Sequence, residues 1–421
     1  MFLRVLGAFL VLAVAATAQA DSPQEFDRLI DIGDMPALAE ALARDGVPSV
    51  NRELAIEMAQ LSLSGAPVDV DRVSGWIEQT DGLSDDQRRG AFRALAERAF
   101  LETRYADAAA ALEHALAFAD DEARADIAPD LALYRVASLV APVRVTSAAG
   151  TTVPITRDMA NQMRVDLRLE DSASVPFLVD TGAEISVIMD RHARTAGLRF
   201  LEGEVQVGTV TEDVTGRLAV ADRVQIGDMI VRNVVFLVLP DDMLTFSDGD
   251  YTADGILGLQ VFAAAGRMGW SQGGGQLALG EAVPVVDATN LRLYWHSGGL
   301  GLEIWRRGHP ASAFFDSGAS RTIFRPGLLA HLDDEERARL VRSSRTRAGV
   351  GGEEAIETQM LDTLALTIGG SELIYQNLTI DPPEEDLPAA DIAAIGNDLV
   401  QRVDRLSLDF RTMRYQVILS D

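Results

Sequence analysis

The stretch Phe177–Glu184 reads FLVDTGAE, and Phe314–Ser320 reads FFDSGAS. Each stretch places an aspartate, Asp180 or Asp316, after apolar residues and before a hydroxyl residue, Gly and Ala. One such segment alone is typical of a turn, because Asp, Ser and Thr bond the local backbone and Gly allows positive φ. An acid at the end of an apolar strand is different, because an ionised carboxylate in a core is costly unless compensated. Two copies predict that the two acids meet.

The two motifs belong to a longer internal repeat. In each copy a strand leads to the aspartate, a segment ending in Ile-Gly precedes an apolar strand, and two apolar residues and Gly come next. Each copy then closes with a predicted pair of strands. The same elements in the same order predict two copies of one β-rich unit, lobe 1 over residues 143–282 and lobe 2 over residues 283–421.

Two such units packed about a pseudo-twofold axis would bring their corresponding turns together. Asp180 and Asp316 would then share one proton, because two close carboxylates do not ionise easily together. The ionised carboxylate would take a proton from a water molecule, and the protonated carboxyl would donate to a substrate carbonyl. The pair therefore predicts general acid–base hydrolysis of an amide.

The paired motif resembles that of the aspartic proteases. Ala after each Gly resembles the retropepsin-like branch, whereas two lobes in one chain resemble the pepsin-like arrangement. Over residues 143–421 the resemblance implies a mainly β, bilobal fold of the double-psi β-barrel type with pseudo-twofold symmetry. It also implies a bacterial enzyme with both lobes fused, in which Asp180 and Asp316 are the catalytic pair.

The resemblance assigns supporting roles to the residues around the aspartates. Thr181 and Ser317 would hydrogen-bond across the lobe interface and hold the two turns together. The small residues of the turns would leave space and let amides face the carboxylates; they are Gly182, Ala183, Gly318 and Ala319. The residues that would pack beside the turns are Ile256, Leu257, Gly258, Ala394, Ile395 and Gly396. Ala394 is smaller than the family usually has there, which predicts looser packing in lobe 2.

The family also covers its cleft with β-hairpin flaps. The Gly-rich segment Arg347–Gly352 resembles the retropepsin flap, and the matching place in lobe 1 is near Val207–Val210, with a tip from Thr211 to Gly216. The flap candidates are Gly208, Thr209, Gly349, Val350, Gly351 and Gly352. Flaps would exclude water and bind an extended peptide by strand addition. Ordinary hairpin turns explain the same residues about equally well.

The composition excludes several kinds of chemistry. The chain has 421 residues, enough for two or three domains, and 48% of them are hydrophobic, which predicts a packed core. A net charge of −27 argues against nucleic acid or an anionic membrane as a partner. There is no Cys, and all 37 basic residues are Arg, which removes thiol and Schiff-base chemistry. The five His are scattered, so we expect no metal and no cofactor.

The first 20 residues are typical of a secretory signal peptide. One Arg precedes an apolar run from Val5 to Ala16, and Ala18-Gln19-Ala20 suits signal peptidase. The pattern predicts a periplasmic or secreted bacterial protein whose mature chain starts at Asp21 and keeps no stable membrane anchor. An uncleaved anchor is the alternative interpretation.

Residues 21–141 predict a helical domain, because apolar residues recur at spacings of three and four. The segment Glu102–Phe118 resembles half of a tetratricopeptide-type (TPR-like) helical hairpin, and a plain helical bundle explains it equally well. Such a domain could recruit a protein partner. It could also be an inhibitory propeptide, but family propeptides are usually shorter and basic, whereas this segment is acidic, which favours a permanent domain.

The sequence therefore predicts an exported aspartic endopeptidase acting on a peptide or protein substrate. The alternative is a non-catalytic peptide-binding or scaffold protein on the same fold, because a fold does not guarantee an activity. The presence of both acids and both hydroxyls favours catalysis.

Overall fold

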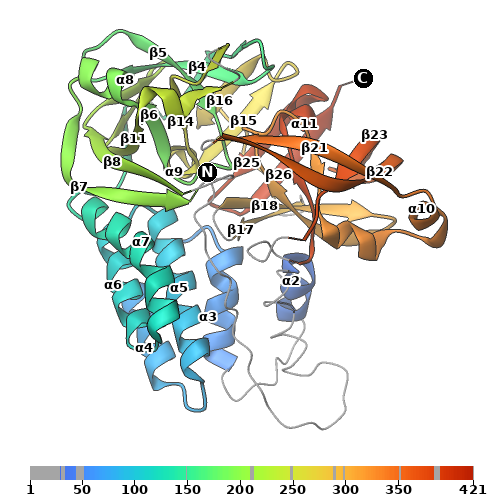
Figure 1. The fold of residues 1–421 in the computed structure, drawn as a ribbon, viewed down its shortest axis with the longest axis horizontal. Coiled ribbons are helices and arrows are strands. Elements are labelled where there is room, and N and C mark those ends of the chain that lie inside the picture. The colour runs from blue at the N-terminus through green and yellow to red at the C-terminus, as the bar shows by residue number, and fades with distance from the viewer. Residues whose placement is uncertain are drawn as a thin grey trace.

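The protein is described by a computed structural model (Figure 1). It describes residues 29, 34–43, 52–147, 149–208, 213–246, 250–287, 291–296, 299–349, 352–383 and 389–420. The predicted signal peptide lies outside these residues. The described residues from Met35 to Ala137 are mainly helical, and those from Arg144 to Leu419 are mainly strand, which confirms the predicted all-α and mainly β parts.

The helical region, residues 35–137, stacks its helices side by side, in blue and teal in Figure 1. Its helices are α2 (Met35–Ala43), α3 (Arg52–Leu63), α4 (Val70–Gln79), α5 (Asp85–Leu101), α6 (Tyr105–Leu116) and α7 (Asp121–Ala137). Ser84 and Gln87 form a capping box that starts α5. Aromatic side chains fill its core, where the rings of Phe100 and Tyr134 stack with centroids 4.5 Å apart. Among the described residues, no helix combines the length and apolar character needed to span a membrane.

Lobe 1 is built on one curled sheet. Its strands run in the order β1-β10-β9-β4-β5-β14-β6-β11-β8-β7. Their bounds are β1 (Arg144–Ser147), β4 (Met163–Leu169), β5 (Ser174–Val179), β6 (Ser186–Met189), β7 (Arg199–Gly208), β8 (Asp213–Ala221), β9 (Val224–Ile226), β10 (Met229–Arg232), β11 (Val234–Leu239) and β14 (Gly255–Leu257), with β3 (Thr156–Arg157) pairing β4. The late strand β14 lies between β5 and β6, parallel to the first and antiparallel to the second.

Short elements join these strands. Helix α8 (Asp190–Thr195) follows β6, and helix α9 (Leu259–Ala265) follows β14. The 3-10 helix η1 (Asp241–Leu244) leads into the two-stranded pair β12 (Thr245–Phe246) and β13 (Tyr251–Thr252). Strand β11 reads VVFLVL and is buried at every position, as expected for a strand covered on both faces.

Lobe 2 repeats this arrangement. Its elements are β18 (Gly299–Arg306), β19 (His309–Phe315), β20 (Ile323–Phe324), η3 (Pro326–His331), α10 (Asp334–Ala338), β21 (Val341–Gly349), β22 (Gly352–Ile368), β23 (Ser371–Ile380), β24 (Asp391–Ile395) and α11 (Asn397–Gln401). Strand β24 lies between β19 and β20, again parallel to the first and antiparallel to the second. The same crossing in both lobes gives the β-rich part its pseudo-twofold symmetry.

A central sheet joins the lobes. Its strands, in the order β2-β16-β15-β25-β26-β17, are β2 (Gly150–Pro154), β16 (Gln276–Gly280), β15 (Arg267–Ser271), β25 (Val403–Asp409), β26 (Arg414–Leu419) and β17 (Leu291–His296). The same sheet continues into lobe 2, because β17 also pairs with β18. Strand β15 of lobe 1 pairs antiparallel with β25 of lobe 2, from Arg267 opposite Asp409 to Ser271 opposite Arg405. The pseudo-twofold axis therefore passes between β15 and β25, and one apolar core continues through both lobes.

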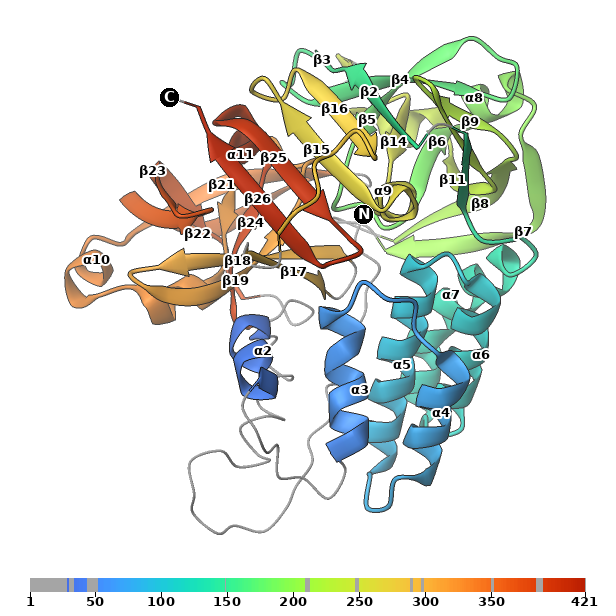
Figure 2. The same ribbon diagram turned by 180° about the vertical axis from the view of Figure 1, so that it is seen from behind.

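The helical region lies along one side of both lobes, as Figures 1 and 2 show from opposite directions. Helix α7 packs against β7 of lobe 1, and α3 packs against β17 of lobe 2. The backbone at Gly65 approaches lobe 2 so closely that an added Cβ would lie 2.0 Å from the carbonyl oxygen of Phe410. Glycine is therefore the residue that fits at this junction.

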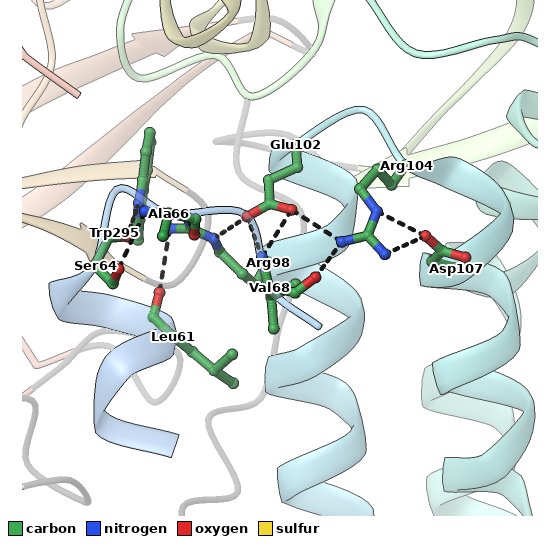
Figure 3. A network of polar contacts seen from close by, with 9 residues as sticks. All are labelled: Leu61, Ser64, Ala66, Val68, Arg98, Glu102, Arg104, Asp107 and Trp295. Carbon is green, nitrogen blue, oxygen red and sulfur yellow. Dashed lines mark hydrogen bonds and ion pairs between the residues drawn. The ribbon is translucent and has the colours of Figure 1, made fainter. Parts of the chain in front are cut away.

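A polar network holds the junction with lobe 2 (Figure 3). Arg98, 4% exposed, donates to the carbonyl oxygens of Leu61 and Ala66 at 3.3 and 3.0 Å and pairs with Glu102 at 2.8 Å. Its guanidinium carbon lies 4.8 Å from the ring centroid of Trp295, whose indole nitrogen donates to the carbonyl oxygen of Ser64 at 3.0 Å. Arg98 thus connects α5, the chain after α3 and lobe 2.

Candidate active site

The two aspartates stand directly after equivalent strands. Asp180 follows β5, and its amide donates to the carbonyl oxygen of Leu257 at 3.1 Å. Asp316 follows β19, and its amide donates to the carbonyl oxygen of Ile395 at 2.9 Å. The two apolar-apolar-Gly segments, at the ends of β14 and β24, therefore lie beside the aspartates. Their carbonyl oxygens bind the chain where β5 and β19 end.

Thr181 and Ser317 are fully buried between the lobes. The Thr181 hydroxyl accepts from the Ser317 amide at 3.0 Å and donates to the carbonyl oxygen of Phe315 at 2.9 Å. The Ser317 hydroxyl accepts from the Thr181 amide at 3.0 Å and donates to the carbonyl oxygen of Val179 at 2.8 Å. All four bonds cross the lobe interface, so each hydroxyl fixes the turn of the other lobe.

Backbone amides orient each carboxyl group. Oδ1 of Asp180 accepts from the amides of Gly182 and Ala183 at 2.8 and 3.2 Å. In the equivalent turn, Oδ1 of Asp316 accepts from the amides of Gly318 and Ala319 at 2.9 and 3.0 Å. These bonds leave the second oxygen of each carboxyl free of the turn amides.

The two turns face each other at close range. A Cβ added to Gly182 would lie 2.7 Å from Cγ of Asp316, and one added to Gly318 would lie 2.4 Å from Cγ of Asp180. The carboxyl group of Asp180 therefore lies close enough to that of Asp316 for its charge to act on the neighbouring pKa. Burial and the neighbouring charge of Asp180 raise the pKa of Asp316 to about 7. The structure thus brings together the two aspartates from the separate lobes.

The residues that follow β14 and β24 support the turns from behind. The amide of Leu259 donates to the carbonyl oxygen of Ala183 at 2.7 Å, and that of Asn397 donates to the carbonyl oxygen of Ala319 at 2.8 Å. A Cβ at Gly258 would lie 2.7 Å from that same Ala183 oxygen, so a larger residue does not fit. Ile256, Leu257, Ile395 and Gly396 are buried beside the turns, whereas Ala394 is half-buried.

The flap candidates fall on two antiparallel hairpins. Gly208 ends β7 opposite Asp213 of β8, and Gly349 ends β21 opposite Gly352 of β22. Thr209, Val350 and Gly351 lie outside the described residues. The predicted lobe 1 tip from Thr211 to Gly216 is too long, because β8 begins at Asp213 and Gly216 pairs with Val205 inside the hairpin.

Three amide side chains near the turns were not predicted as site residues. Gln162 of lobe 1 donates to the carbonyl oxygen of Gly318 at 2.8 Å and accepts from Asn397 at 3.1 Å. Gln260, in the first turn of α9, connects lobe 1 to the helical region. A polar residue within the apolar run ILGLQVF was the available sequence signal for Gln260. The two others had no signal of this kind.

Glu184 lies four positions after Asp180 and is 3% exposed. Burial, together with the charges of Glu97 and Asp130, raises the pKa of Glu184 to about 8. Burial is also the main cause that raises the pKa of Glu97 to about 8 and that of Asp130 to about 7. Residue 97 is on α5 and residue 130 is on α7, so charges of the helical region act on the carboxyl that follows the Asp180 turn. Within the described ranges, no group of three or more such side chains is placed to hold a metal ion.

Comparison with known proteins agrees with this geometry. Residues 163–261 match the family model described as Aspartyl protease, a segment that holds Asp180, β14 and the start of α9. The match supports an aspartic protease relationship for this segment, which lies within the mainly β part of the chain. A search of curated proteins gave no match.

Two solved structures are also similar to the chain. Conglutin gamma, a basic 7S globulin from lupine seeds, shares 11% identity at a TM-score of 0.41 over 65% of this chain and 95% of its own. A retropepsin-like aspartic protease from Rickettsia conorii shares 15% identity at a TM-score of 0.23, covering 32% of this chain and 92% of its own. Neither similarity is close enough to indicate a function.

Proposed function

We propose that the chain is an exported aspartic endopeptidase in which Asp180 and Asp316 together activate a water molecule. One observation carries the proposal. The two carboxyl groups come from different lobes and meet between turns that are bonded to each other by Thr181 and Ser317. A match to an aspartyl protease model over residues 163–261 supports it independently.

The arrangement suits acid–base hydrolysis of an amide. The pair holds one proton at pH values below the raised pKa of Asp316. The ionised carboxylate removes a proton from water as the water oxygen attacks the peptide carbonyl carbon, and the protonated carboxyl donates to the carbonyl oxygen. The tetrahedral intermediate then collapses, the C–N bond breaks, and the leaving nitrogen takes up a proton.

The structure of the turns explains why the pair can work without rearrangement. The amides that bind Oδ1 of each aspartate fix the carboxyl planes before substrate arrives, so little reorganisation accompanies the reaction. A peptide in an extended conformation is the substrate that the hairpins β7–β8 and β21–β22 would bind, by strand addition. We further propose that the protein acts in the periplasm or outside a bacterial cell, and that the helical region contributes to partner or substrate choice.

Replacement of either aspartate tests the proposal. Asp180→Asn and Asp316→Asn should each lower kcat/KM on a peptide library by at least about 100-fold, with folding retained. Asp166→Asn is the matched control, because Asp166 is exposed on β4 and should leave cleavage unchanged. Assays from acidic to neutral pH with and without pepstatin would identify the class. Cleavage that persists in Asp180→Asn contradicts the proposal, and binding without cleavage by the unaltered protein favours a peptide-binding role instead.

A further inference from the structure

Gln260 lies in the first turn of α9 and is 3% exposed. Its side-chain nitrogen donates to the carbonyl oxygen of Phe100 at 2.7 Å, and its side-chain oxygen accepts from the Tyr105 hydroxyl at 2.9 Å. Phe100 is near the end of α5 and Tyr105 begins α6, so both bonds reach the corner that joins these two helices. A buried amide with both ends paired is a strong constraint on the position of α9.

The same turn of α9 holds the catalytic turn of lobe 1. The amide of Gln260 donates to the carbonyl oxygen of Glu184 at 3.3 Å, and the preceding amide, of Leu259, donates to that of Ala183 at 2.7 Å. Ala183 in turn donates its own amide to Oδ1 of Asp180. A continuous series of hydrogen bonds therefore runs from the corner of α5 and α6 to the catalytic carboxyl.

Apolar packing follows the same route. Ala183 and Ile185, on either side of Glu184, are fully buried. They belong to one apolar core with Phe100, Tyr105 and other residues of the helical region. The helices thus contribute part of the core that surrounds the catalytic turn of lobe 1, as well as hydrogen bonds to α9.

The equivalent position in lobe 2 is anchored differently. The amide of Asn397 donates to the carbonyl oxygen of Ala319, as that of Leu259 does to Ala183 in lobe 1. The next residue, Asp398, accepts from the amide and the hydroxyl of Thr322 at 2.7 and 2.8 Å. These partners come from within lobe 2. Both copies have an internal hydroxyl that accepts from the glycine amide, Ser186 from Gly258 at 3.0 Å and Thr322 from Gly396 at 3.2 Å. They differ at the next polar side chain, because Gln260 bonds the helical region whereas Asp398 bonds lobe 2.

We propose that Gln260 is a positioning residue that couples the helical region to the turn carrying Asp180, and that helices α5 and α6 are a fixed part of the catalytic unit. The kinetic side of this inference rests on the proposed endopeptidase function. The structural side does not, because it concerns the order of the catalytic turn. Loss of this region would leave the buried amide of Gln260 without its two partners.

Tyr105→Phe is the sharpest test, because it removes one hydroxyl and keeps the ring that packs at 5.5 Å from Phe100. In the full chain, hydrogen exchange should quicken at the amides of Ala183 and Leu259, and kcat should fall about 10-fold with KM little changed. Gln260→Met, which keeps the size of the side chain and removes both bonds, should have the same effects. Tyr415→Phe is the matched control, since this buried hydroxyl donates to the carbonyl oxygen of Glu303 in lobe 2.

The outcomes separate the two claims. Faster exchange at the catalytic turn in Tyr105→Phe and Gln260→Met, but not in Tyr415→Phe, supports the coupling even if the unaltered protein cleaves no peptide. Unchanged exchange at Ala183 and Leu259 in both variants overturns it, as does an equal change in the control. A fall in kcat without a change in exchange also overturns it, because the effect would then not pass through the turn. Lack of cleavage by the unaltered protein counts against the endopeptidase proposal alone.

Discussion

The hydroxyl groups of Thr181 and Ser317 form reciprocal hydrogen bonds across the lobe interface. Each hydroxyl accepts from the backbone amide of the other residue and donates to a carbonyl oxygen in the opposite lobe, that of Phe315 or Val179. The exchange is fully buried, so neither turn can lose its partner without leaving polar groups unpaired. The distance between Asp180 and Asp316 therefore depends on hydrogen bonds that involve both lobes.

Thr181→Val keeps the shape of the side chain and removes its hydroxyl. The Ser317 amide and the Phe315 carbonyl would then be buried without a partner, and we expect a loss of about 1–3 kcal/mol in the free energy of unfolding. Urea denaturation measures the loss. Thr181→Ser retains the hydroxyl and should stay close to the unaltered protein. A Val variant of undiminished stability would show that the exchange contributes little.

Gly182→Ala should abolish most cleavage by displacing the carboxyl group opposite. The added Cβ would lie 2.7 Å from both Cγ and Oδ1 of Asp316, closer than side chains approach. Gly75→Ala in α4 is the control, since its Cβ would meet nothing nearer than 3.7 Å and should stabilise the helix by up to about 1 kcal/mol. Values of kcat/KM together with melting temperatures separate the two effects, and full activity of Gly182→Ala would contradict the facing arrangement of the turns.

The pH–rate profile should follow the proton on the aspartate pair. Because the pKa of Asp316 is raised to about 7, the proton remains bound at mildly acidic pH and is lost as the pH rises through about 7. Activity that requires this proton should fall about tenfold per pH unit above that value. The measurement is kcat/KM on one peptide across pH. A profile that stays flat well above pH 7 would show that the proton is not required.

The carboxyls of Glu97, Asp130 and Glu184 should make the protein less stable as pH rises. Their ordinary pKa values are 4.5 for Glu and 3.8 for Asp, and burial raises them to about 8, 7 and 8. At a pH between the ordinary and the raised pKa values, the folded chain binds more protons than the unfolded chain. The contribution of these carboxyls to stability is therefore fully present below the ordinary pKa values and is lost as the pH rises through the raised ones. One such proton contributes at most about 1.4 kcal/mol per pH unit.

Melting temperatures of the unaltered protein and of Glu184→Gln, measured from acidic to mildly alkaline pH, test this dependence. The Gln variant should lose less stability with rising pH, because its amide mimics the neutral acid. Glu202→Gln, at an exposed position of β7, should follow the unaltered protein. Parallel curves for Glu184→Gln and the unaltered protein would exclude Glu184 as a source of the effect.

Arg98→Ala should loosen the junction between the helical region and lobe 2. It removes donors to Leu61 and Ala66 and leaves Glu102 without its buried partner, so we expect a loss of about 3 kcal/mol in unfolding free energy. Arg135→Ala is the control, because its ion pair with Glu113 is exposed and should contribute within about 1 kcal/mol. Equal effects of the two substitutions in urea denaturation would contradict the role given to Arg98.

The bilobal fold could be predicted because its evidence is local and occurs twice. Each copy carries the strand, the aspartate and the apolar-apolar-Gly segment in order, and a turn with Gly after Asp has few conformations available. The turn-forming residues of TEDVTG predict the lobe 1 hairpin tip too far along the chain, because Gly216 pairs with Val205 between the two strands. Pairing with the opposite strand outweighed local preference there.

Contacts between distant segments could not be predicted in this way. Tyr105 and Gln260 are 155 positions apart, and neither residue type by itself indicates that partner. Glu184 has the sequence context of an ordinary acid after the motif, but in the structure it is buried, and the charges of Glu97 and Asp130 help to raise its pKa. The sequence thus predicts the local strands and turns of each lobe, whereas the contacts that attach the helical region depend on tertiary packing.

The antiparallel pairing of β15 with β25 has a mechanical consequence. Strand β15 of lobe 1 is paired with β25 of lobe 2 at five successive positions, from Arg267 to Ser271. A hinge motion that separates the lobes would therefore break the main-chain hydrogen bonds of this sheet. The two lobes should therefore keep their relative positions along this seam.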